Sequence, residues 1–177
     1  MRKASGAVAA MIVAIALYFT LSWGIESLHV LTSRAYGLDD VWHSQSVYGF
    51  GRIFGLDPEQ LVKLAAFFGV MKLAAAVVFA VHLGDRLRAL LAGGEPNAEI
   101  LESGLILVVL LSVVAIVPAL WLNDFVLAQQ QTIELLLAGL TAALAVIERG
   151  DDAAAPQPVA DAESAIPADA RWFSPWR

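Results

Sequence analysis

Apolar residues along this chain are gathered into four long runs, and most polar residues lie between them. The runs cover residues 5–28, 61–84, 100–122 and 125–147, and together they contain only five charged residues. A helix needs about 20 mostly apolar residues to cross the ~30 Å hydrocarbon core of a bilayer, and each run is that long. The pattern therefore predicts an all-α integral membrane protein with four transmembrane helices in an antiparallel bundle.

The predicted membrane domain covers residues 1–149, and its first run is expected to stay in the membrane. That run is longer than the roughly 7–15 apolar residues of a signal peptide. Residues 30–60 form the loop after it, where Asp39 and Asp40 are suited to cap a short helix through Ser46. The aromatic residues of this loop favour a helix lying in the headgroup layer or, alternatively, a small cap over a cavity.

Basic residues beside the runs predict the orientation of the spans. Positive charges favour the cytoplasmic side of short loops. One side of the predicted bundle carries Arg2, Lys3, Arg86, Arg88 and Arg149, and the other carries only Arg34 and Arg52. Both termini are therefore expected in the cytoplasm and the 30–60 loop outside. The alanine-rich, lysine-poor composition is typical of bacteria, which makes the inner membrane the expected location.

The last residues, 150–177, form a segment of different composition. They are rich in Ala, Pro and Asp and bury too little apolar surface to fold alone, so a disordered acidic tail is predicted. The tail ends in an aromatic and basic cluster, which consists of Arg171, Trp172, Phe173, Trp176 and Arg177. Such residues rest in the lipid interface or dock on a protein partner, and the same chemistry serves both.

Two charged residues lie deep inside the apolar runs. Lys72 is near the middle of the second run and Glu134 lies at a similar depth in the fourth, with Gln130 and Gln131 one turn before it. Because a charge at the centre of a bilayer is costly, both side chains should face protein or water. We expect Lys72 and Glu134 to form an intramembrane ion pair, with Gln130 or Gln131 in the same network. The pair acts either as a clamp between helices or as a functional site.

A second polar cluster is expected near the outer surface. Glu26 and His29 lie one turn apart at the end of the first run, and Asp39, Asp40 and His43 follow in the loop. Carboxylate and imidazole groups bind divalent metals, so these five residues are a candidate metal cluster. Polar residues at a membrane surface are also ordinary, and we expect neither a bound metal nor a cofactor.

The composition narrows the functional classes further. The chain has no cysteine, which removes thiolate metal sites, cysteine nucleophiles and disulfides. Its net charge of −6 and the absence of a basic patch make nucleic acid a poor partner. No phosphate-binding loop or nucleophile elbow is present, so an enzyme is not expected.

Two functional hypotheses remain. The first is an accessory or assembly subunit of a membrane complex, whose partners are the lipid bilayer and other membrane subunits or further copies of itself. The second is an oligomeric small transporter or channel-like protein that uses Lys72 and Glu134. Small-residue faces on the spans favour the first, and the intramembrane charges favour the second.

Overall fold

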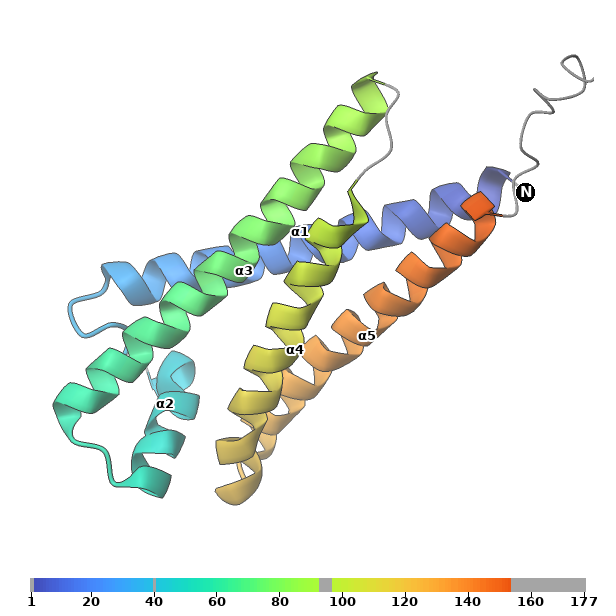
Figure 1. The fold of residues 1–177 in the computed structure, drawn as a ribbon. Helices are drawn as coiled ribbons and strands as arrows, with labels where there is room; N and C mark the ends of the chain where they lie inside the picture. The colour runs from blue at the N-terminus through green and yellow to red at the C-terminus, as the bar shows by residue number, and fades with distance from the viewer. Residues whose placement is uncertain (1, 40, 93–96, 154–177) are drawn as a thin grey trace, which may run out of the picture.

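The computed structural model describes residues 2–39, 41–92 and 97–153. All regular elements in these ranges are α-helices, and their order along the chain can be followed in Figure 1. They are α1 (Arg2–Thr32), α2 (Val41–Phe54), α3 (Pro58–Ala92), α4 (Ala98–Trp121) and α5 (Phe125–Ala153). The predicted tail, from residue 154 on, and Asp40 lie outside the described residues.

Four of these helices are long and apolar enough to cross a membrane, as the sequence predicted. The qualifying segments are Gly6–Thr32, Pro58–Ala92, Ala98–Trp121 and Phe125–Gly150. Large apolar side chains on their outer faces are exposed, for example Leu136 at 67% and Val77 at 53%. An apolar outer face of this kind suits a surrounding of lipid rather than water.

Local capping groups set the ends of the helices. At the start of α3, the side chain of Gln60 accepts a hydrogen bond from the backbone N–H of Asp57 (3.0 Å), and Pro58 occupies the first helical position. The side chain of Asn97 caps α4 by accepting from the N–H of Glu99 (2.9 Å). The side chain of Asp124 caps α5 in the same way by accepting from the N–H of Leu127 (3.1 Å). The turn that joins α4 to α5 has only three residues.

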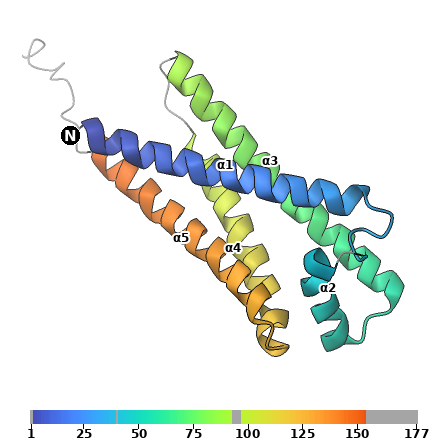
Figure 2. The same ribbon diagram turned by 180° about the vertical axis from the view of Figure 1, so that it is seen from behind.

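The helices cross at clear angles. Figures 1 and 2 show α1 crossing α3, and α4 lying beside α5. Figure 2 also shows that the start of α1 lies near the end of α5, and that the two helices diverge toward α2. The core between α1 and α3 contains Phe19, Trp23 and Phe79, all fully buried. The rings of Phe19 and Phe79 are stacked, with their centres 5.2 Å apart.

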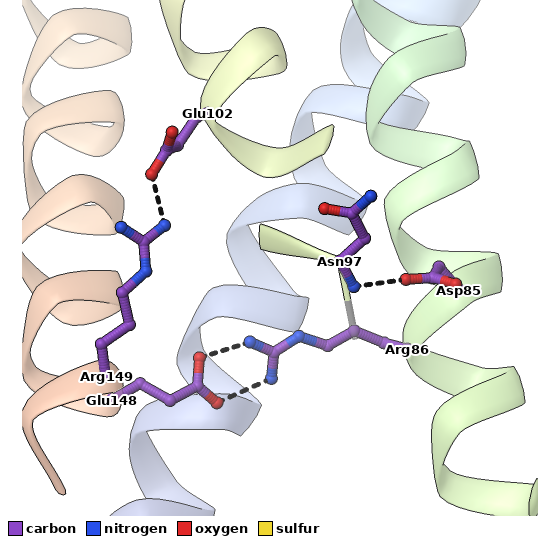
Figure 3. A network of polar contacts seen from close by, with 6 residues as sticks. All are labelled: Asp85, Arg86, Asn97, Glu102, Glu148 and Arg149. Atoms are coloured by element: carbon purple, nitrogen blue, oxygen red, sulfur yellow. Dashed lines mark hydrogen bonds and ion pairs between the residues drawn. The ribbon is translucent and has the colours of Figure 1, made fainter. Parts of the chain in front are cut away.

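Polar contacts tie α3, α4 and α5 together at the end of the bundle away from α2. Figure 3 shows them between Asp85, Arg86, Asn97, Glu102, Glu148 and Arg149. The Arg86 guanidinium donates to both carboxylate oxygens of Glu148, and Arg149 pairs with Glu102. One turn before Arg86, His82 is buried, and neither of its ring nitrogens has a hydrogen-bond partner among the described residues.

Candidate functional site

An open cavity lies where α1 and α5 diverge, on the side of the bundle nearer α2. Its volume is about 420 Å³, and four helices line it. Pockets of roughly 300–1,000 Å³ are typical of small-molecule sites. Its polar lining consists of Ser22, Glu26 and His29 from α1, Ser46 from α2, Lys72 from α3, and Gln130 and Gln131 from α5. We call this space the α1–α5 cavity.

An ion pair forms part of the wall of the α1–α5 cavity. The Lys72 ammonium donates a hydrogen bond to Glu26 Oε1 at 2.5 Å, and each side chain is 16% exposed. The ammonium also lies 5.6 Å from the centre of the Trp23 ring, a distance typical of a cation–π contact. Both charged side chains are thus mostly covered by protein, and both line the cavity.

Small residues on α3 bring α1 close enough to make this pair. Ala65, Gly69 and Ala76 lie on the same face of α3 as Lys72, and all three are buried. A Cβ atom added at Gly69 would lie 3.0 Å from a methyl group of Val30 on α1. A larger residue at this position would require the side chains of Val30 and Leu31 to shift, so the glycine allows α1 to lie close to α3 here.

The predicted ion pair between Lys72 and Glu134 is not the one that forms. Glu134 is buried at 2% exposure, and its carboxylate accepts hydrogen bonds from Trp23 Nε1 and from Ser112 Oγ, both at 3.2 Å. Trp23 offers its indole N–H to Glu134 and its ring to Lys72. Because α1 crosses α3, Glu26 of α1 is the carboxylate that reaches the ammonium.

These contacts join four helices into one polar network. It runs from Glu26 through Lys72 and Trp23 to Glu134 and Ser112. One end of the network faces the α1–α5 cavity, and the other end is sealed in the core. The structure thus separates two roles that the sequence had assigned to a single pair: the buried end can hold the helices together, and the open end can meet a solute.

The remaining predicted site residues are placed as follows. Gln130 and Gln131 line the α1–α5 cavity, as do Glu26 and His29, whereas Asp39 does not. Asp40 and the side chain of His43 lie outside what the structure describes. Within the described residues, no group of three or more His, Asp or Glu side chains is arranged to hold a metal ion.

Four residues of the site were not among the predicted site residues: Ser22, Trp23, Ser46 and Ser112. Trp23 resembles an interfacial tryptophan in sequence, and Ser112 is a lone hydroxyl in an apolar run. Ser46 was considered only as part of a short helix. A usable signal existed for Trp23, because it lies three residues before Glu26 and hence on the same face of α1.

The aromatic and basic cluster at residues 171–177 lies outside the described part of the chain. Comparison of the sequence and the fold with protein-family models, curated proteins and solved structures finds no match.

Proposed function

We propose that this protein is a small transporter-type membrane protein that binds a small polar solute in the α1–α5 cavity. The observation that carries the proposal is the position of the Lys72–Glu26 pair in the wall of an open cavity. A charge at the centre of a bilayer costs at least about 2.5 kcal/mol. Both side chains are 16% exposed and both line the cavity, so a ligand can reach the pair.

The proposed topology follows the distribution of basic residues. The four long helices cross a bacterial inner membrane as an antiparallel bundle, with both termini in the cytoplasm and α2 in the outer interface. The α1–α5 cavity then opens toward the outside, and the contacts of Figure 3 lie at the cytoplasmic end. Four helices enclose too little volume for a continuous pathway, so a transport route involves two or more copies.

The accessory-subunit hypothesis retains one observation in its favour. Gly6 and Ala10 are exposed on α1, and with Ala9 and Val13 they line a mostly apolar hollow of about 470 Å³, whose wall also includes Arg86 and Glu148. Small residues on an exposed transmembrane face permit close helix approach. This face suits a second copy of the chain or a partner subunit, and it is compatible with solute binding at the other end.

A matched pair of cysteine variants tests the proposed function. The chain has no cysteine of its own, so Ser22→Cys and Leu21→Cys each introduce a single thiol at nearly the same depth in α1. Ser22 lines the cavity, whereas Leu21 is 53% exposed on the outer face of the helix. Only a hydrated thiol ionises and reacts with a charged methanethiosulfonate reagent that cannot cross membranes.

We expect the Ser22→Cys variant to react from the outside at least about tenfold faster than Leu21→Cys, because the thiolate is the reactive species and lipid suppresses ionisation. The measurement is the rate of labelling in right-side-out vesicles. Equal rates for the two variants, or labelling of Ser22→Cys only from the cytoplasmic side, would overturn the proposal of an outward-facing solute cavity.

A further inference from the structure

We propose that the ligand of the α1–α5 cavity is a small zwitterion that carries a primary ammonium and a carboxylate or phosphate group. The ammonium binds Glu26, and the anionic group binds Lys72. This assignment rests on the proposed function, since it names the chemical class of solute for the same cavity. It is carried by the charges in the cavity wall, by the unused bonding capacity of the ion pair and by the mouth of the cavity.

The charges of the wall favour a ligand without net charge. Apart from His29, the acidic and basic side chains that line the cavity in the described part of the chain are Glu26 and Lys72, and they are of opposite sign. A ligand with a single charge can pair with only one of these two groups. A zwitterion can pair with both groups at once and keeps the cavity neutral.

The ion pair can accept such a ligand without being dismantled. Its hydrogen bond uses one ammonium proton of Lys72 and one carboxylate oxygen of Glu26. An ammonium has three donors and a carboxylate has two oxygens, so each group retains capacity for a further partner. The Trp23 ring helps to hold the ammonium in place beside the anionic group of the ligand. The amides of Gln130 and Gln131 add both donors and acceptors to the same cavity.

Two kinds of molecule that carry these two groups fit the cavity. Residues of α1 and α5, the two helices that diverge in Figure 2, line it, and Ile25 and Leu127 add apolar surface to that lining. A free amino acid could enter from the water, and the head group of an aminophospholipid could enter from the outer leaflet. Both carry a primary ammonium together with an anionic group, so the pairing with Glu26 and Lys72 is the same.

The test measures protection of the Ser22→Cys variant from labelling, in nanodiscs of phosphatidylcholine. The quaternary ammonium of this lipid has no N–H to donate to Glu26. The soluble probes are L-alanine, which carries both charges, propionate, which carries only the negative charge, and ethylamine, which carries only the positive charge. They have three, three and two carbon atoms. A second set of nanodiscs contains phosphatidylethanolamine, and a third contains phosphatidylglycerol at the same fraction.

We expect L-alanine to slow the labelling at least fivefold and in a saturable manner, while propionate and ethylamine have no effect. If the natural source is a lipid, phosphatidylethanolamine slows the labelling instead and phosphatidylglycerol does not. Adding Glu26→Gln or Lys72→Met to the Ser22→Cys variant should abolish the protection, whereas Lys63→Met should preserve it. Lys63 lies on the same helix, but it pairs with Glu59 at the surface.

Should Lys72→Met fail to fold, Lys72→Arg keeps the positive charge and should retain protection. Protection by propionate alone or by ethylamine alone would overturn the zwitterion assignment, and so would the absence of protection by every probe. In each of these cases faster labelling of Ser22→Cys than of Leu21→Cys would still support the solute cavity. The failure of the ligand assignment and the failure of the proposed function are thereby distinguished.

Discussion

At the scale of single residues, Trp23 connects the two ends of the polar network. Its side chain is fully buried, its N–H donates to Glu134, and its ring packs edge-on against Phe19 while its face meets the Lys72 ammonium. One side chain thus combines apolar burial with two polar interactions, which Trp can do because only its N–H is polar. Replacing it affects the core and the cavity wall together.

The same substitution at two tryptophans tests this role. Trp23→Phe removes the hydrogen bond to Glu134 and part of the core volume, so we expect a loss of about 1–2 kcal/mol of stability. Trp121→Phe changes an indole that is 66% exposed, and its effect should stay within about 0.5 kcal/mol. Thermal unfolding in mild detergent measures both. Equal losses of stability for the two variants would contradict the role of Trp23 in connecting the two ends of the polar network.

Residue-level prediction from the sequence found the unusual charges but not their partners. Lys72 and Glu134 stand out because charges are rare in apolar runs. Their depths along two helices matched, but depth says nothing about which helix lies between them. The choice of Glu26 over Glu134 depends on the crossing of α1 over α3, and that crossing leaves no mark in the spacing of either charge.

At the scale of elements, α2 is more than a surface helix. Val47 is 4% exposed, the Phe50 ring stacks on Phe68 of α3 at 5.9 Å, and Ser46 reaches the α1–α5 cavity. A Cβ atom added at Gly49 would lie 2.7 Å from Cβ of Pro118 on α4. The position of α2 is therefore fixed by contact with two spans, and α2 contributes to the wall of the site.

Two glycine substitutions separate packing from helix propensity. Gly49→Ala forces α2 away from the rigid Pro118 ring, and we expect it to destabilise the protein by about 1–3 kcal/mol. Gly139→Ala meets no atom within 4 Å and should be neutral or stabilising by up to about 1 kcal/mol, because Ala favours the helix. Thermal unfolding again gives the comparison. A comparable loss from Gly139→Ala would show that packing against Pro118 is not the cause.

Hydropathy predicted the number and approximate place of the spans, but the helices continue beyond the apolar runs. The first run was expected to end at residue 28, and α1 continues to Thr32; the fourth was expected to end at residue 147, and α5 continues to Ala153. Backbone hydrogen bonding extends a helix through polar residues as readily as through apolar ones. The apolar run therefore marks the part of a helix suited to lipid, not the whole helix.

At the scale of the whole molecule, the two ends of the bundle differ. At one end, ion pairs between Arg86 and Glu148 and between Arg149 and Glu102 hold α3, α4 and α5 together (Figure 3). At the other end, α1 and α5 diverge (Figure 2), and residues of both helices line the α1–α5 cavity. Helix crossing angles follow from the packing of many side chains, so the sequence pattern alone could not place this opening.

The pairing of Lys72 with Glu26 is the central claim, and solid-state nuclear magnetic resonance can test it directly. Lys3→Arg and Lys63→Arg leave Lys72 as the sole lysine of the chain. With ¹⁵N in the lysine side chain and ¹³C in the glutamate carboxyl groups, dipolar coupling reports the carboxylate nearest to the ammonium in lipid bilayers. We predict a strong coupling that disappears in Glu26→Gln and persists in Glu134→Gln. A coupling that persists in Glu26→Gln and disappears in Glu134→Gln would show that Lys72 pairs with Glu134 in the core, and it would contradict the pairing of Lys72 with Glu26.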